Sequence, residues 1–330
     1  MRVGETLLDV VDLTVVFDGI GSPAQAVNGV SFTVRAGRSL GIVGESGSGK
    51  SVTAQAILRV LDSPPGRVEG GRVLFDGVDL LEVPERRMQA IRGRQIAIVF
   101  QDALTSLNPR LKVGYQLVEA ARQADRELTK EAARERAVHL LERVQVPSAR
   151  ARMNAYPHEL SGGMRQRVLI AMGLIGGPRL LIADEPTTAL DVSVQAEIID
   201  LLKSLTAEMG LSVILISHNL AVVANVVDEL VVMYAGQVVE SGPVSAVLQR
   251  PAHPYTKALL RSLPDLDRPK EVLHPIGGAV PNLHDLPSGC LFAPRCDFVE
   301  DLCVGERPLL REVGVGSARC HFSEQLAVSP

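Results

Sequence analysis

The sequence has no apolar run long enough to span a membrane. Its longest apolar runs, at residues 168–175 and 211–216, stop well short of the roughly 18 uninterrupted apolar residues that a membrane-spanning helix needs. The N-terminal sequence also lacks the basic-then-apolar layout of a secretory signal, because Glu5, Asp9 and Asp12 interrupt its apolar positions. We therefore expect a cytoplasmic protein.

An excess of positive charge is missing too. The formal net charge is −4 at pH 7, whereas a protein that mainly coats nucleic acid needs a basic excess to displace counterions from the phosphates. The composition argues against that class, although local basic patches stay compatible with it. There is no internal repeat or low-complexity tract, and an apolar fraction of 46% is enough for a large folded core.

Cysteine is absent from the first 289 residues. The four cysteines all lie in the C-terminal part of the chain: Cys290, Cys296, Cys303 and Cys320. In a cytosolic chain such a cluster indicates a metal before disulfides. Intervals of five, six and sixteen residues match neither a standard zinc ribbon nor a bacterial ferredoxin run. The spacing leaves zinc, a [4Fe–4S] cluster and free buried thiols open.

The apolar pattern predicts short buried strands that alternate with helices, which is typical of a mostly parallel α/β sheet. We expect a helix at 51–61 and strands at 10–17, 30–34, 38–43, 95–100, 179–183, 211–217 and 228–234. Between 106 and 163 charged helical sequence predicts a helical subdomain inserted into a domain that covers 1–250. Closely spaced prolines predict a loop-rich extension over 251–330.

The sequence GESGSGKS, at 44–51, fits the phosphate-binding pattern G-x-x-x-x-G-K-[ST] between a predicted strand and a predicted helix. Its glycines let backbone N–H groups surround phosphate oxygens, and the helix dipole points to the same place. Lys50 would add a charge for the β- and γ-phosphates, and Ser51 would bind Mg²⁺. A glycine-rich turn without a ligand is the alternative. The predicted nucleotide-binding residues are Gly44, Glu45, Ser46, Gly47, Ser48, Gly49, Lys50, Ser51 and Val52.

The sequence LLIADEP, at 180–186, is an apolar strand that ends in two acids. Because side chains alternate along a strand, Asp184 and Glu185 should point in different directions. Asp184 then suits the magnesium shell through a water, and Glu185 suits a general base that activates the attacking water. Two acids at a strand end are usually only solvated. Together with a phosphate loop they predict the second half of a nucleotide site.

With these motifs the chain resembles the ABC ATPase family over essentially its whole length. LSGGMRQR, at 160–167, is similar to the family signature, with Met164 where most members have glutamine. The resemblance implies the P-loop NTPase fold of ABC ATPases: α/β, with a mixed sheet, an inserted helical subdomain and the cysteine-containing extension. Gln101 in IVFQD would help coordinate Mg²⁺ and sense a transmembrane partner, and TALD would be the D-loop that ends at Asp191.

The resemblance also assigns the histidine in ISHNL. His218 would contact the γ-phosphate, although a lone histidine after a buried strand more often has a structural hydrogen-bonding role. Lys50, Glu185 and His218 are thus the expected catalytic residues. Phe17 stands where the family stacks an aromatic ring on adenine, and a place in the core is an equal alternative.

The resemblance further implies dimerisation of ATPase subunits. Ser161, Gly162 and Gly163 begin a helix whose N–H groups could meet a γ-phosphate, but they belong to the helical subdomain. In the family such residues complete the site of an opposing subunit. Two bound ATP molecules then hold the pair closed, and hydrolysis opens it.

Within the family the chain most resembles the ATP-binding subunits of dipeptide and oligopeptide importers, whose relatives serve nickel and other small solutes. SLNPR at 106–110, SGGMRQRVLIAM at 161–172, TTALDVSVQAEI at 187–198 and HPYTKALLRSLP at 253–264 carry this likeness. The resemblance implies a magnesium-dependent ATP hydrolase at the cytoplasmic face of the cell (inner) membrane, and it favours a [4Fe–4S] cluster on the cysteines over zinc. Its expected partners are a second, different ATPase subunit, two transmembrane permease subunits and an extracytoplasmic solute-binding protein, with no nucleic acid.

Three alternatives remain at this point. The cargo could be nickel or another small solute, because nothing in such a subunit touches cargo. A non-transport ABC ATPase acting on DNA or the ribosome is a second reading, which the acidic balance disfavours. A nucleotide-binding regulator without turnover is a third, and the presence of Lys50, Glu185 and His218 speaks against it.

Overall fold

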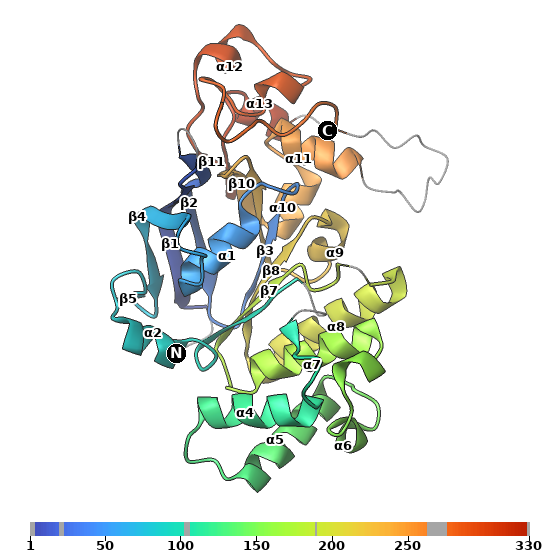
Figure 1. Ribbon diagram of the computed structural model, residues 1–330. Coiled ribbons are helices and arrows are strands. Elements are labelled where there is room, and N and C mark those ends of the chain that lie inside the picture. Colours follow the sequence, from blue (N-terminus) through green and yellow to red (C-terminus); the bar gives the residue numbers. More distant parts are fainter. Residues whose placement is uncertain (1–3, 20–22, 102–105, 189, 263–275, 329–330) are drawn as a thin grey trace. The chain divides into compact units, whose positions relative to one another are not determined.

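The computed structural model describes residues 4–19, 23–101, 106–188, 190–262 and 276–328 (Figure 1). They fall into two compact units. The described residues of unit 1 come from 1–5, 35–38 and 83–216, and those of unit 2 from 6–34, 39–82 and 217–330. The N-terminal strands, the glycine-rich loop and the C-terminal extension therefore fold within the same unit. None of the described helices is long and apolar enough to cross a membrane.

Unit 1 contains three strands in parallel register, with the middle one paired on both sides. They are β6 (Ile96–Val99), β7 (Leu180–Asp184) and β8 (Ser212–Ser217). Every residue of β7 and β8 is buried, as expected for parallel strands with both faces covered. Helix α7 (Gly162–Leu174) packs closely on this sheet, since a Cβ at Gly173 would stand 3.2 Å from Val99 Cγ2.

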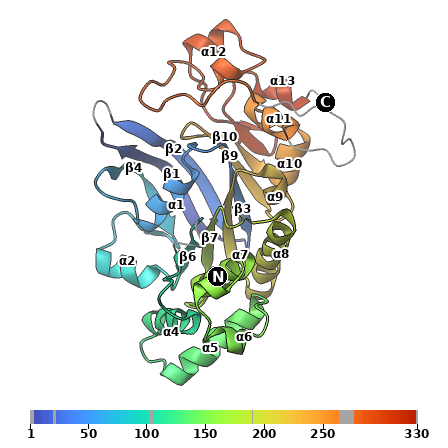
Figure 2. The same ribbon diagram turned by 45° about the vertical axis from the view of Figure 1, so that its right-hand side comes forward.

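The remainder of unit 1 is helical (Figure 2). Its helices are α2 (Glu85–Ile91), α4 (Val113–Ala124), α5 (Lys130–Arg143), α6 (Ala149–Arg152), the 3₁₀ turn η1 (Pro157–Glu159) and α8 (Val192–Met209). Helix α4 buries Val113, Leu117, Val118 and Ala121, which lie on one face at helical spacing. The predicted helical character of 106–163 is confirmed for its described residues, whereas the domain boundaries stay a prediction.

Unit 2 contains an antiparallel sheet and a run of mixed strands. The sheet has the order β2 (Ala24–Arg35), β1 (Thr6–Phe17), β4 (Gly66–Phe75), β5 (Val78–Asp79). In the mixed run, β3 (Ser39–Val43) pairs in parallel with β9 (Glu229–Tyr234), which is followed in antiparallel order by β10 (Gln237–Pro243), β12 (Gly316–Ala318) and β11 (Arg311–Val313). Helix α1 (Lys50–Leu58) follows β3, and α9 (Leu220–Ala224) follows β8.

The C-terminal extension continues the strands of unit 2, because β12 pairs with β10. Helix α10 (Val244–Gln249) follows β10. The helical segments of the extension, orange to red in Figure 1, are α11 (Pro254–Arg261), η2 (Ala293–Arg295), α12 (Asp301–Gly305) and α13 (Ser323–Val328). The seven predicted strands and the predicted helix at 51–61 are confirmed, with ends that differ by up to six residues.

Candidate functional site

The glycine-rich loop joins the buried strand β3 to helix α1. Gly47 and Gly49 have φ values of 78° and 96°, a backbone conformation that favours glycine. A Cβ at Gly49 would stand 2.5 Å from the carbonyl oxygen of Ala26, and one at Gly44 would overlap the carbonyl oxygen of Met233. Glycine is thus required at both ends of the loop, where the backbone passes directly against neighbouring backbone.

Lys50 lies inside this loop, with only 4% of its surface exposed. Its ammonium group donates hydrogen bonds to the carbonyl oxygens of Gly44, at 2.8 Å, and Glu45, at 2.9 Å. Ser48 is buried beside it. The remaining predicted loop residues are placed at the exposed tip, Ser46 and Gly47, or half-buried in the first turn of α1, Ser51 and Val52.

Glu45 is held by two residues of the C-terminal extension. Its backbone N–H donates to the Tyr255 hydroxyl at 2.9 Å, and its carboxylate accepts two hydrogen bonds from the Arg295 guanidinium, at 2.7 and 2.9 Å. Sequence reasoning missed Tyr255 and Arg295. Two sequence features could have indicated them: Arg295 is the single charged residue between the cysteines of CLFAPRC, and Tyr255 is the tyrosine of HPYTKALL.

The two acids at the end of β7 have different environments. Asp184 is buried, with 3% of its surface exposed, while Glu185 is half-buried. Glu185 has a φ of 46°, which is uncommon for a residue other than glycine and is typical of functional turns. Its carboxylate accepts hydrogen bonds from the Gln101 side chain at 3.1 Å and from the Thr188 hydroxyl at 2.8 Å. The structure therefore brings two predicted site residues together.

The predicted signature begins helix α7. Ser161 is its N-cap, and the Ser161 hydroxyl accepts a hydrogen bond from the Met164 N–H at 3.3 Å. A Cβ at Gly163 would stand 2.7 Å from a methyl group of Val194, so the first turn of α7 lies directly against the start of α8. Ser161, Gly162, Gly163 and Asp191 line one open pocket of about 380 Å³ within unit 1.

Three predicted positions are less informative. The Phe17 ring lies over Gly66, because a Cβ there would stand 3.0 Å from the ring, and it is half-buried, which fits both a core and a stacking role. His218 is exposed immediately after β8. Residues 102–105, which follow Gln101, and Ala189 of the predicted D-loop lie outside the described residues.

The four cysteines are free and line one narrow pocket of about 20 Å³. The N–H groups of Phe298 and Phe322 donate to the sulfurs of Cys296 and Cys320, each at 3.4 Å, and burial raises the pKa of both thiols to about 11. Among the described residues, no group of three or more His, Cys, Asp or Glu side chains could hold a metal ion. The thiols thus share a pocket without forming a metal-binding group among the described residues, and the predicted zinc or [4Fe–4S] site stays a prediction.

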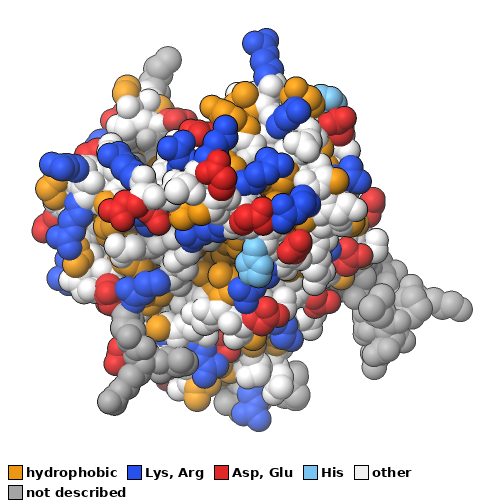
Figure 3. Space-filling model, turned by 90° about the horizontal axis from the view of Figure 1, so that it is seen from below, with side chains coloured by type: hydrophobic (Ala, Val, Ile, Leu, Met, Phe, Trp, Pro, Cys, Tyr) orange, Lys and Arg blue, Asp and Glu red, His pale blue; other side chains and the backbone are white. Residues whose placement is uncertain are grey.

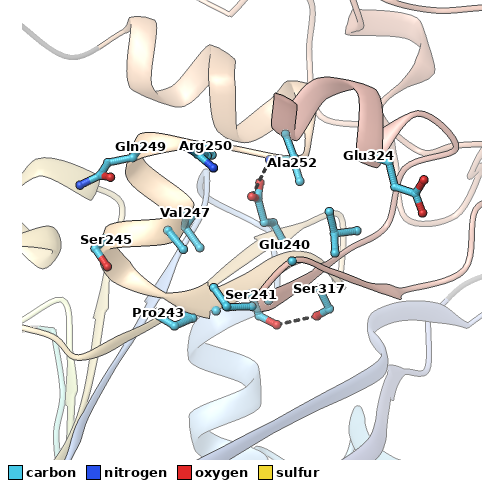
Figure 4. A pocket seen from close by; sticks show the side chains of 17 residues that line it. Glu240, Ser241, Pro243, Ser245, Val247, Gln249, Arg250, Ala252, Ser317 and Glu324 are labelled. Atoms are coloured by element: carbon cyan, nitrogen blue, oxygen red, sulfur yellow. Dashed lines mark hydrogen bonds between the residues drawn. The ribbon is translucent and has the colours of Figure 1, made fainter. Parts of the chain in front are cut away.

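A larger pocket, of about 720 Å³, lies between β10, α10 and β12 (Figure 4). In its wall the buried Glu240 carboxylate accepts hydrogen bonds from the N–H groups of Ala252, at 2.7 Å, and His253, at 3.1 Å. Burial raises the pKa of Glu240 to about 7, and burial lowers the pKa of His253 to about 3. The Ser241 and Ser317 hydroxyls, 2.8 Å apart, join β10 to β12.

The face seen in Figure 3 carries basic and acidic side chains interspersed with apolar ones. It is not a continuous basic surface of the kind that binds nucleic-acid backbones.

Comparison with known proteins identifies the family of this chain. Residues 27–188 match the ABC transporter family, and residues 239–303 match the C-terminal region of oligopeptide/dipeptide transporters. The chain is 49% identical over 308 residues to the oligopeptide transport ATP-binding protein OppD of Bacillus subtilis, covering 93% of this chain and 86% of that protein. It is 46% identical over 319 residues to the dipeptide transport ATP-binding protein DppD of Escherichia coli, covering 96% of each.

Solved structures give the same result for the fold. A dimeric ATP-binding cassette in a post-hydrolysis state with ADP and Pi matches with a TM-score of 0.64 and 26% identity, covering 72% of this chain and 98% of that one. CbiO1 of Clostridium perfringens, part of the transporter complex CbiONQ, matches with a TM-score of 0.63 and 27% identity, covering 74% and 90%. The chain therefore belongs to the ABC transporter family, as an ATP-binding protein that carries the oligopeptide/dipeptide-type C-terminal region.

Proposed function

We propose that this protein binds and hydrolyses ATP to energise the import of oligopeptides or dipeptides. The observation that carries the proposal is the phosphate loop before α1, with Lys50 buried among its carbonyl groups, in a chain that also has the oligopeptide/dipeptide C-terminal region. The names of its relatives, an oligopeptide and a dipeptide transport ATP-binding protein, support the same cargo class. Transport of nickel or another small solute by the same ATPase is the alternative.

Phosphate binding follows from the loop itself. The Lys50 ammonium exchanges the carbonyl oxygens of Gly44 and Glu45 for β- and γ-phosphate oxygens, while the loop N–H groups and the N-terminus of α1 face the same anion. Ser51, Gln101 and Asp184 are the proposed magnesium-binding residues. When bound there, magnesium would neutralise charge on the phosphates.

Hydrolysis needs a base that orients water. Glu185 is the proposed base, and its hydrogen bonds to Gln101 and Thr188 fix the carboxylate in one orientation before water arrives. His218 is proposed to contact the γ-phosphate, and Phe17 to stack on adenine. Removal of Glu185 should therefore affect turnover more than nucleotide binding.

The pocket at the start of α7 is proposed as the contact for a second ATPase subunit. It presents Ser161, Gly162, Gly163 and Asp191 around an open space at the N-terminus of a 13-residue helix, a suitable place for a phosphate group. We infer that the subunit works at the cytoplasmic face of a membrane, beside two permease subunits and with an extracytoplasmic binding protein.

The four cysteines are proposed to hold a [4Fe–4S] cluster, with zinc as the alternative. Support comes from the donor set: four free thiols line a common pocket, and two of the sulfurs accept backbone N–H groups, as metal-bound thiolates do. The cluster would supply folding energy to a segment with little core of its own. Iron and sulfide analysis of anaerobically purified protein tests this, and stoichiometric zinc without iron would overturn it.

Nucleotide titration tests the proposed ATP site. Lys50→Ala should lose most of the affinity for magnesium-ATP, whereas the matched control Lys130→Ala, at an exposed position of α5, should not change it. Equal affinity of the two variants would refute the site. Co-purification of membrane subunits, followed by a test of which peptides raise ATP turnover, then addresses the cargo.

A further inference from the structure

The phosphate loop contains an acidic residue, which is unfavourable next to a nucleotide. In GESGSGKS, Glu45 directly follows the first glycine, and its side chain is 28% exposed. A carboxylate at this position repels phosphate groups unless its charge is neutralised and directed away from them. The neutralising group is the guanidinium of Arg295, which contacts both carboxylate oxygens and belongs to a side chain that is 4% exposed.

We propose that Arg295 is a positioning residue for the phosphate loop: it neutralises Glu45, fixes the loop in the form that accepts phosphate, and so makes nucleotide affinity depend on the C-terminal extension. This inference rests on the proposed ATP site. It goes beyond that site because it assigns a role in nucleotide binding to a segment outside the nucleotide-binding motifs.

The position of Arg295 is strongly fixed by its surroundings. It ends the 3₁₀ turn η2, one residue before Cys296, and its Nε donates to the carbonyl oxygen of Gly277 at 2.7 Å. Its Nη1 also donates to the Tyr234 hydroxyl at 3.3 Å, and its guanidinium carbon lies 5.7 Å from the centre of the Tyr234 ring and 5.9 Å from that of Phe292. A planar, bidentate contact of this kind is specific to arginine.

A second contact holds the backbone at the same residue. The Glu45 N–H donates to the Tyr255 hydroxyl, and Tyr255 lies in α11 with its ring 4.7 Å from that of Tyr234 and 5.3 Å from that of Phe292. The side chain and the backbone of Glu45 are thus both held by one aromatic cluster built largely from the extension. The loop cannot shift at this residue without breaking that cluster.

The charges predict the effect of breaking the contact. In Arg295→Gln a half-buried carboxylate is left without its cation beside the phosphate site, and the affinity for ATP should fall by about tenfold. ADP, with fewer phosphate charges, should lose less. The rate at saturating ATP should change little, because Arg295 does not touch the reacting atoms in this scheme.

A double-variant cycle tests the proposal in the full-length protein. Magnesium-ATP and magnesium-ADP dissociation constants, with KM and kcat for hydrolysis, are measured for Arg295→Gln, Glu45→Gln and the double variant. Arg261→Ala is the matched control, because this exposed arginine of the same extension has its guanidinium 4.0 Å from the Asp297 carboxylate. Lys50→Ala reports separately on the ATP site.

We expect Arg295→Gln to weaken ATP binding about tenfold and the double variant to recover most of that loss, since the offending carboxylate is gone. A loss that the double variant does not recover would indicate a purely structural role and overturn the proposal. So would wild-type ATP affinity in Arg295→Gln while Lys50→Ala binds weakly, a result that leaves the ATP site intact. Normal affinity in Lys50→Ala would instead refute the ATP site itself.

Discussion

The pH dependence of the unfolding free energy should distinguish the contributions of two buried groups whose pKa values are shifted in opposite directions. Glu240 is 3% exposed and His253 is 1% exposed, and the Glu240 carboxylate accepts a hydrogen bond from the backbone N–H of His253. Lys257 adds an attractive charge near Glu240. The perturbation is Glu240→Gln, which keeps the shape of the side chain and removes its titration.

The sign and size follow from the two pKa values. Burial raises the pKa of Glu240 from 4.5 to about 7, so the folded state keeps a proton that the unfolded state has released. Stability therefore falls as pH rises from 4.5 to 7, by about 3 kcal/mol in total. Burial lowers the pKa of His253 from 6.5 to about 3, so below pH 6.5 the unfolded state binds a proton that the folded state does not. The free energy of unfolding therefore falls as the pH drops below 6.5. Between pH 4.5 and 6.5 the two slopes oppose each other.

Urea unfolding at pH 5, 6, 7 and 8 measures these slopes. The wild-type free energy of unfolding should stay nearly flat from pH 5 to 6, whereas that of Glu240→Gln should rise by about 1 kcal/mol as the histidine slope remains alone. His253→Asn keeps an acceptor at the N-cap of α11 and should show the reverse slope. Parallel curves for wild type and Glu240→Gln would refute the assignment of a raised pKa to Glu240.

Three further predictions concern the nucleotide site. Gly49→Ala should weaken magnesium-ATP binding and lower the melting temperature, because its Cβ would stand 2.5 Å from a carbonyl oxygen at a φ of 96°; an unchanged titration would contradict this. Ser161→Ala and Thr129→Ala each remove an N-cap, and each should lower the free energy of unfolding by about 1 kcal/mol. Only Ser161→Ala should also reduce ATP hydrolysis, and equal activities of the two variants would argue against a role of the signature. Glu185→Gln should lower the hydrolysis rate about 10²- to 10⁴-fold while nucleotide still binds, and a normal rate in a phosphate-release assay would exclude Glu185 as the base.

The buried strands could be predicted from the sequence, because a short continuous run of apolar and β-branched residues is compatible with few structures other than a buried strand. Strands β7 and β8 are buried at every position. Strand β4 was not predicted, since its glycines and alternating exposed residues weaken the pattern, and β11 and β12 are three residues each. Their structure depends on pairing with distant strands, which local sequence does not encode.

The residues of the candidate site also divide into those that local sequence indicates and those that depend on distant contacts. The phosphate loop and the acids at the end of β7 were predicted because their chemistry follows from short, local spacing. Gln101 was assigned to the site only through family resemblance, and its contact with Glu185, 84 positions away, was not predicted. The pair Glu45–Arg295 was not predicted, because nothing near either residue specifies a partner 250 positions away.

That separation has a consequence for biosynthesis. A ribosome adds about 5–20 residues per second, so roughly 12 to 50 s pass between translation of Glu45 and translation of Arg295, 250 positions later. During that time the nascent chain already carries its complete phosphate-binding sequence without the cation that compensates its carboxylate. A subunit shortened by premature termination or proteolysis before Arg295 would stay in this condition permanently. Such a fragment would keep each nucleotide-binding motif and still compete poorly for ATP.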